Sequence, residues 1–176
     1  MSELPYFKYH PDPIATGSVE ASHEKCECCE MVRGFIYTGV VYGENDIESV
    51  CPWCIADGKA STIKDASFSD AHPLLHAGIS IEIADEVALR TPGYESWQQD
   101  SWMSCCSDAC EFHGDAKEEE LGALEGENRT RIAKSFGIPR PDFEEMLEHY
   151  QPKGSTGIYK FQCRSCRLEH YNWDSC

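Results

Sequence analysis

Residues 26–54 read CECCEMVRGFIYTGVVYGENDIESVCPWC, with a C-x2-C pair at each end of a segment rich in β-branched and aromatic residues. A C-x2-C turn points two sulfur atoms in the same direction, at the separation that a tetrahedral ion requires. The 21 residues between the pairs hold GFIYTGVVY at 34–42, whose composition predicts strand structure broken near Gly39. The pattern therefore predicts a zinc-ribbon-like part over residues 22–64. Its predicted ligands are Cys26, Cys29, Cys51 and Cys54.

Four further cysteines predict a second site, whose two halves lie far apart in the chain. The C-x3-C pair at 106–110 has nearly the spacing of one helical turn, so both thiols could lie on one face at a helix end. The C-x2-C pair at 163–166 lies between two strand-like segments, 158–162 and 168–173, which predicts a metal-binding knuckle in a C-terminal hairpin. The second predicted set of ligands is Cys106, Cys110, Cys163 and Cys166.

At one position of each predicted site, another nearby side chain could be the ligand instead. The alternatives are His113, His170 or Cys176 at the second site, and Cys28 or Cys105 in place of the neighbouring cysteine. Four thiolates close the coordination sphere, so no position remains for water or substrate. We therefore expect two zinc ions with a structural role, and note that tetrahedral sulfur also suits iron.

The CPWC motif at 51–54 also fits a thiol redox protein, because a CPxC motif after a short strand and before a helix is typical of thioredoxin-like proteins. That reading uses only Cys51 and Cys54, whereas the zinc reading accounts for eight cysteines. The sequence therefore favours metal binding and keeps redox chemistry as an alternative.

Composition limits the partners that we expect. The chain has 176 residues, 11 of them cysteine, and a formal net charge of −16. No segment resembles a signal peptide or reaches the ~20 apolar residues of a membrane span, so we expect a cytoplasmic protein with reduced thiols. The negative charge repels a phosphate backbone and argues against nucleic acid. A protein partner, which could be basic, fits the charge, and so does a simple role in solubility.

The expected fold is α+β in a single domain, residues 1–176, with small zinc-stabilised sheets and several short helices. Residues 84–176 are predicted to form a helical part that the C-terminal zinc-knuckle hairpin closes. Apolar spacing predicts a helix over 81–90 that a Pro-Gly turn ends, and another that starts with Asp142 as its cap. Residues 4–21 are rich in Pro and Gly and are expected to form an extended arm on the surface.

The Pro-Gly turn after residue 90 predicts a ligand surface, because aromatic and polar side chains there could stack on and hydrogen-bond a small molecule. Alternatively, Trp97 and Trp102 pack a core around the second zinc. A carboxylate directly after CPWC could also lie at the edge of the first metal. The candidate ligand or partner surface is Arg90, Tyr94, Trp97, Gln98 and Asp57. Fingerprints of nucleotide-binding loops, zinc proteases and serine hydrolases are absent, which favours a protein without catalytic activity.

Long motifs of the chain resemble the CbrC-like family of bacterial proteins, which is associated with colicin tolerance. The motifs are LPYFKYHPDPIATGS at 4–18, FIYTGVVY at 35–42, CPWCIADGKA at 51–60, RTPGYESWQ at 90–98 and CSDACEFHGD at 106–115. The resemblance extends from Leu4 to about Asp174 and implies a small, cysteine-rich cytosolic protein whose eight ligand cysteines follow the family pattern.

Three hypotheses for function follow. The first is a non-enzymatic, acidic protein-binding module linked to bacteriocin tolerance or envelope stress. The second is a small enzyme or ligand-binding protein with a pocket around residues 90–102. The third is a thiol redox protein that uses Cys51 and Cys54.

Overall fold

The computed structural model of the protein describes residues 3–43 and 47–176. The strands are β1 (Val19–Ala21), β2 (Phe35–Tyr37), β3 (Ser104–Cys105), β4 (Asp108–Ala109), β5 (Glu111–Asp115), β6 (Thr156–Gln162) and β7 (Glu169–Ser175). The helices are α1 (Pro52–Ala56), α2 (Lys59–Lys64), α3 (His72–His76), α4 (Ile81–Arg90), α5 (Glu118–Gly122), α6 (Gly126–Phe136) and α7 (Arg140–His149). The fold is therefore mixed α+β with small antiparallel sheets and several helices, which confirms the predicted class.

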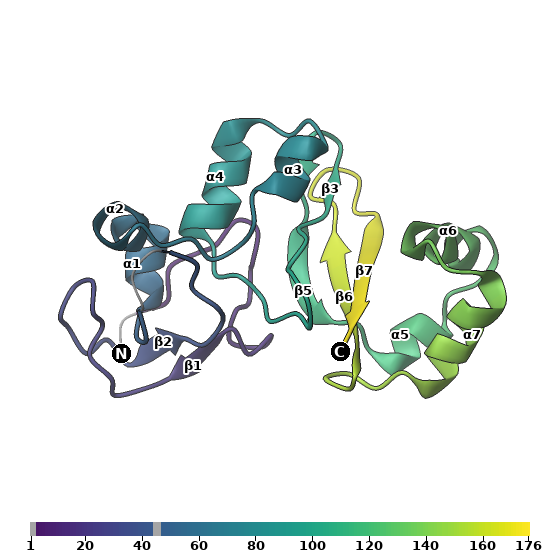
Figure 1. Ribbon diagram of the computed structural model, residues 1–176, viewed down its shortest axis with the longest axis horizontal. Helices are drawn as coiled ribbons and strands as arrows, with labels where there is room; N and C mark the ends of the chain where they lie inside the picture. Colours follow the sequence, from purple (N-terminus) through teal and green to yellow (C-terminus); the bar gives the residue numbers. More distant parts are fainter. Residues whose placement is uncertain (1–2, 44–46) are drawn as a thin grey trace.

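The elements follow one another along an elongated molecule (Figure 1). The hairpin β1-β2 lies with α1 and α2 at one end, and α5, α6 and α7 lie at the other. Between them stand α3, α4 and the antiparallel sheet β5-β6-β7, beside the small hairpin β3-β4.

The described residues bury three apolar cores, one in each of these regions. The N-terminal core surrounds Ile36, Ile55 and Phe68, and the central core is rich in aromatic side chains. The C-terminal core lies under α5, α6 and α7 and includes Phe143. Burial of this apolar surface is the main favourable term in folding, so each region has its own source of stability.

Strand β6 joins two of these cores, because successive side chains of a strand point to opposite faces of its sheet. Tyr159 and Phe161 face the central core, whereas Ile158 belongs to the C-terminal core. In the central core Tyr94 stacks on Phe112 with ring centroids 4.5 Å apart. The sheet is thus covered on both faces, and this holds β5 and β6 in place beside the turn that carries Tyr94.

The N-terminal segment is not the surface arm that its composition predicted. Phe7 is buried in the N-terminal core and Tyr9 in the central core. His10 is 0% exposed, with Nδ1 2.8 Å from the carbonyl oxygen of Pro92 and Nε2 2.7 Å from Oγ1 of Thr16. The alternating aromatic residues bury one side of the segment, so it connects two cores instead of lying on the surface.

Two predicted helices can be compared with the structure. Helix α4 covers Ile81–Arg90, as predicted, and ends where Thr91 turns extended before Pro92. Helix α7 begins at Arg140, two residues before the predicted cap, with Pro139 as its N-cap residue. Proline fixes φ near the helical value, so a proline-rich start can begin a helix without the side-chain cap that Asp142 was expected to provide.

Candidate metal centres and ligand cleft

The first predicted metal site starts with a tight turn at Cys26 and Cys29. The N–H of Cys26 donates to the carbonyl of Met31 at 3.0 Å, and the N–H of Glu30 donates to the carbonyl of Cys26 at 2.8 Å. Glu30 adopts a left-handed φ of 58°. These local bonds close a knuckle whose two sulfur atoms point to the same side.

The other half of this site lies at a helix start instead of a second hairpin. Cys51 is the N-cap residue of α1, and Cys54 lies in its first turn. The N–H of Cys51 donates to Sγ of Cys26 at 3.3 Å, which links the two halves directly. The first site is therefore a knuckle combined with a helix N-terminus, and it differs in this half from the predicted zinc ribbon. Pro52 at the first helical position favours the helix over a second knuckle.

The four sulfur atoms of this first cluster fit one tetrahedral ion. All lie within 4.8 Å of one another, and Sγ of Cys29 is 3.8 Å from Sγ of Cys51. A Zn–S bond of ~2.3 Å in tetrahedral geometry places sulfur atoms about 3.8 Å apart. The cluster consists of Cys26, Cys29, Cys51 and Cys54, as the spacing predicted.

Protonation within the first cluster shows why it suits a cation. A hydrogen bond from Cys51 lowers the pKa of Cys26 to about 4, and burial raises the pKa of Cys54 to about 12. Four thiolates this close together repel one another, so they cannot all ionise without a compensating positive charge. A bound divalent ion supplies that charge and takes the place of the protons.

The second cluster is built from two hairpin turns. Cys163 repeats the pattern of the first knuckle, with its N–H donating to Leu168 at 2.9 Å and Arg167 donating back to its carbonyl at 3.0 Å. Opposite it, the two-residue turn between β3 and β4 holds Cys106 and Ser107 at left-handed φ values of 53° and 59°. Non-glycine residues pay roughly 1–2 kcal/mol for this conformation. Metal coordination by the turn would offset that cost.

The ligand set of the second cluster differs from the prediction at one position. The structure gathers Cys105, Cys106, Cys163 and Cys166. Sγ of Cys105 lies 3.7 Å from Sγ of Cys106 and 3.8 Å from Sγ of Cys166, which again matches tetrahedral zinc. Cys110 was expected here on helical spacing, but residues 104–109 form a hairpin, which carries Cys110 into the central core.

The remaining alternatives do not join either cluster of the described residues. Cys110 is 0% exposed, and Nε1 of Trp102 donates to its carbonyl at 2.9 Å. Cys28 is buried in the N-terminal core beside the first cluster. His113 approaches Glu111 at 3.4 Å instead of the sulfur atoms. All eleven cysteines carry free thiols.

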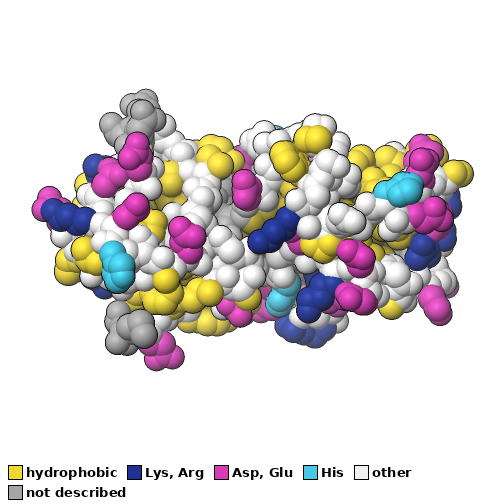
Figure 2. All heavy atoms as spheres, turned by 90° about the horizontal axis from the view of Figure 1, so that it is seen from below, with side chains coloured by type: hydrophobic (Ala, Val, Ile, Leu, Met, Phe, Trp, Pro, Cys, Tyr) yellow, Lys and Arg dark blue, Asp and Glu magenta, His cyan; other side chains and the backbone are white. Residues whose placement is uncertain are grey.

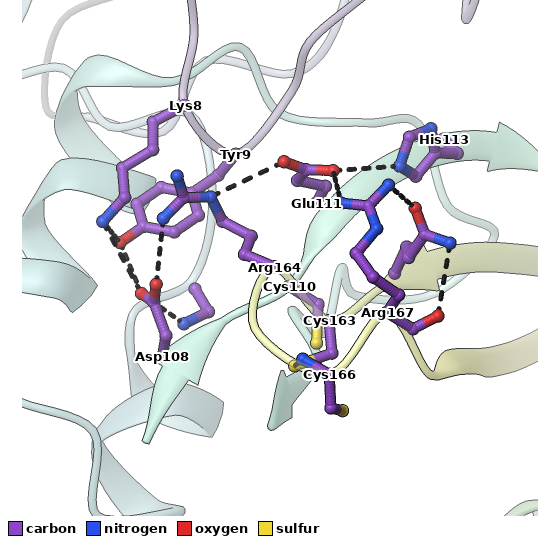
Figure 3. A network of polar contacts seen from close by, with 12 residues as sticks. Lys8, Tyr9, Asp108, Cys110, Glu111, His113, Cys163, Arg164, Cys166 and Arg167 are labelled. Carbon is purple, nitrogen blue, oxygen red and sulfur yellow. Dashed lines mark hydrogen bonds and ion pairs between the residues drawn. The ribbon is translucent and has the colours of Figure 1, made fainter. Parts of the chain in front are cut away.

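A network of charges braces the second cluster (Figure 3). Arg164, inside the knuckle, pairs with Asp108 at 3.1 Å and with Glu111 at 3.6 Å. Arg167, just after the knuckle, pairs with Glu111 at 3.4 Å. Tyr9 donates to Asp108 at 2.7 Å and connects the network to the N-terminal segment. These contacts hold the knuckle against β4 and β5, and partners of this kind tune metal affinity.

The five residues of the predicted ligand surface do not form one site in the structure. Nη2 and Nε of Arg90 donate to the carbonyl of Ala56 at 2.8 and 3.1 Å, which braces α4 against α1. Asp57 accepts the N–H of Lys59, and Gln98 bonds the C-terminal strand. Tyr94 and Trp97 instead line a cleft of about 310 Å³. The alternative that Trp97 and Trp102 both pack a core agrees with the structure for Trp102, which is buried in the central core, and is wrong for Trp97, which is half-exposed.

The cleft lies where the first hairpin meets the central sheet. Its walls include 16–18 and 38–39 on one side and 114–115, 153–154 and Tyr159 on the other. A bulge in β5 opposite β6 shifts the register before Asp115, and Gly114 at the bulge has φ +89° with Thr16 close by. The bulge re-aims the following residue, so Asp115 lines the cleft. The sequence prediction missed this residue, and the glycine before it was the available signal.

Two charged groups and one exposed ring give the cleft its chemistry. The N–H of Lys153 donates to Oδ2 of Asp115 at 3.1 Å, and burial raises the pKa of that carboxyl group. Nε1 of Trp97 donates to the carbonyl of Gly154 at 3.0 Å, which fixes the ring at the rim with 52% of its surface exposed. The cleft thus offers a carboxylate, an ammonium and an aromatic face to a ligand.

The chain is similar to known proteins over almost its whole length. The profile of the uncharacterised protein family UPF0167 matches residues 4–175. The chain belongs to this family. A UPF0167 protein of Pseudomonas aeruginosa is 47% identical over 173 residues, covering 97% of both chains. UPF0167 proteins of Mycobacterium bovis and Mycobacterium tuberculosis are each 38% identical over 172 residues, covering 93% of this chain and 89% of theirs.

No solved structure matches this UPF0167 chain. Within the described ranges, none of its helices has the length and apolar character that a bilayer crossing needs.

Proposed function

We propose that this UPF0167 protein is a non-enzymatic, zinc-stabilised binding protein in which two structural zinc ions hold the walls of the cleft. The observation that carries the proposal is the spacing of the sulfur atoms, 3.7–3.8 Å between the measured pairs, in two clusters of four thiols. Four thiolates leave zinc no open position, so the metals stabilise the fold and take no part in a reaction.

Each proposed zinc ion lies where it can brace one wall of the cleft. The first cluster clamps both ends of the segment that contains β2 and residues 38–39. The second clamps the β3-β4 turn to the β6-β7 turn, and β5 and β6 carry Asp115 and Tyr159 to the opposite wall. Loss of either metal would therefore loosen one wall.

The cleft is a better candidate for the working surface than the overall acidity. Figure 2 shows acidic side chains scattered from one end of the visible face to the other, with no single patch that a basic protein would cover. A concave site with an aromatic face and few polar groups is the usual form of a small-ligand site. The link to bacteriocin tolerance stays a prediction that rests on the sequence resemblance alone.

Redox chemistry at CPWC is the less favoured alternative. Cys51 and Cys54 share a cluster with two further thiols, so a metal ion engages all four where a disulfide would use two. Free thiols throughout the chain fit a reducing compartment such as the cytoplasm.

Elemental analysis of protein purified without added metal or chelator tests the metal part. The expected content is two zinc ions per chain, falling to one in Cys29→Ala and in Cys166→Ala but unchanged in the exposed Cys176→Ala. A metal-free protein that forms a reversible Cys51–Cys54 disulfide would instead support the redox alternative.

Thermal unfolding of the zinc-loaded protein in a broad mixture of soluble metabolites tests the binding part. A ligand of the folded state raises the midpoint temperature. The expected rise is present in the wild type and lost in Trp97→Ala. A rise of equal size in both proteins would place the ligand outside the cleft.

A further inference from the structure

The cleft presents opposite charges that do not meet in a direct ion pair. Asp115 and Lys153 both line it, and among residues 3–43 and 47–176 neither side chain forms a direct ion pair, although the Lys153 ammonium acts on the Asp115 carboxyl group from a longer distance. Within the part of the chain that the structure describes, the one hydrogen bond to the Asp115 side chain comes from the backbone N–H of Lys153, and it occupies one of the two carboxylate oxygen atoms. Lys153 itself is held at a left-handed φ of 62°, in a turn where the N–H of Gly154 donates to Gln151 at 2.9 Å.

The depth of Asp115 makes its charge valuable for recognition. The carboxyl group is partly buried between β5 and the 153–154 turn, and burial raises its pKa. A partly desolvated carboxylate without a cation in direct contact is costly, and an ammonium group bound directly to it would relieve that cost. Glu95 at the exposed rim adds negative charge on the same side.

The rest of the lining is apolar or uncharged. Tyr94 and Phe112 form part of the floor, and the half-exposed ring of Trp97 stands at the rim. Thr16 and Ser18 add hydroxyl groups. A volume of about 310 Å³ is at the small end of ligand sites, which are typically ~300–1,000 Å³. A ligand of a few carbon atoms with an apolar side chain fits this space better than a nucleotide or a folded partner.

Resting on the proposed function, we infer that the cleft binds a small zwitterion of the α-amino-acid class. Its ammonium group contacts Asp115, its carboxylate contacts Lys153, and its side chain packs against Trp97. This assignment gives each charge of the cleft a direct partner and also uses the aromatic rim. A simple amine would be repelled by Lys153, and a simple acid would be repelled by Asp115.

Thermal unfolding of the zinc-loaded full chain with each of the twenty common amino acids is the first measurement. For the one that raises the midpoint most, calorimetry then compares the free amino acid with its amide, which lacks the carboxylate, and its N-acetyl derivative, which lacks the ammonium. The free amino acid is expected to bind at least about tenfold more tightly than either derivative, because each derivative loses one charge-assisted contact with the cleft.

Two charge-neutral variants identify the contacts. Asp115→Asn keeps an acceptor for the Lys153 N–H and is expected to bind the free amino acid about tenfold or more weakly while binding the N-acetyl derivative no worse. Lys153→Met is expected to bind the free amino acid about tenfold or more weakly while binding the amide no worse. The matched controls Glu119→Gln and Lys134→Met remove exposed charges on α5 and α6 and are expected to bind as the wild type does.

The outcomes separate this inference from the proposed function. Equal binding of all three forms, or no effect of any amino acid, overturns the zwitterion. If a metabolite mixture still stabilises the wild type but not Trp97→Ala, the cleft remains a ligand site for another class. If neither the amino acids nor the metabolite mixture stabilises the wild type, the binding part of the proposed function fails as well.

Discussion

The choice between Cys105 and Cys110 as the fourth ligand of the second cluster can be tested with two matched substitutions. Cys105→Ala removes a sulfur atom 3.7 Å from Cys106 and 3.8 Å from Cys166. Structural zinc contributes an apparent ~10–16 kcal/mol over its four ligands, so one thiolate accounts for about 2.5–4 kcal/mol. We therefore expect zinc affinity at this site to fall by roughly two to three orders of magnitude.

Cys110→Ala changes the central core beside the second cluster, where burial and then the charge of Cys163 raise the pKa of Cys110 to about 12. Its side chain is 0% exposed, so the substitution costs about 1–2 kcal/mol of stability from lost burial and a small cavity. Both zinc ions are expected to stay bound with wild-type affinity. Competition with a chromophoric zinc chelator, counted as zinc released per chain, separates the two effects. The ligand assignment is refuted if Cys110→Ala releases one zinc early while Cys105→Ala retains both.

Three further perturbations have expected outcomes. Glu111→Gln weakens the contacts of Arg164 and Arg167 and should lower zinc affinity at the second site by about 10–100-fold without changing the first, as measured by the same competition. Burial raises the pKa of Asp115 in the folded state, so this group stabilises the fold below its unfolded-state pKa, and the stabilisation is lost as pH rises through the folded-state pKa. Asp115→Asn should therefore raise the unfolding temperature at pH 7 but not near pH 3.5. Equal shifts at the two pH values would contradict this. Burial lowers the pKa of His10 to about 4, so stability present above pH 6.5 should fall by up to about 3 kcal/mol between pH 6.5 and 4; denaturant unfolding of His10→Gln should lack this part of the slope.

The two metal clusters differ in their access to solvent, which bears on their lability. Cys26, Cys51 and Cys54 are buried in the first cluster, whereas Cys106 and Cys166 are exposed in the second. Solvent and chelators reach exposed sulfur atoms more easily, so the second zinc is expected to leave first. The wall of the cleft that carries Asp115 would then loosen before the other.

Local patterns in the sequence predicted a substantial part of this protein. The knuckles at Cys26 and Cys163 need only hydrogen bonds that close within six residues and one left-handed residue each, so the C-x2-C spacing was sufficient to locate them. Helix α4 was predicted with its bounds because apolar spacing starts it and a proline ends it. Such features depend on neighbours along the chain, and those neighbours can be read directly.

Other features depended on contacts between distant segments. The β3-β4 turn lacks the usual Asn-Gly signal, so the sequence did not reveal that Cys105 would replace Cys110. The surface arm became a buried connector because two separate cores receive Phe7 and Tyr9.

The sequence by itself thus determined three of the four cysteine pairs, the acidic charge and the mixed class of the fold. Tertiary structure decided the fourth thiol of the second cluster and the position of the cleft. Asp115 and Trp97 are 18 residues apart, and Lys153 follows 38 residues after Asp115, so no local pattern links them. They meet because a bulge, a turn and a shared aromatic core pack together, and that packing is a property of the whole chain.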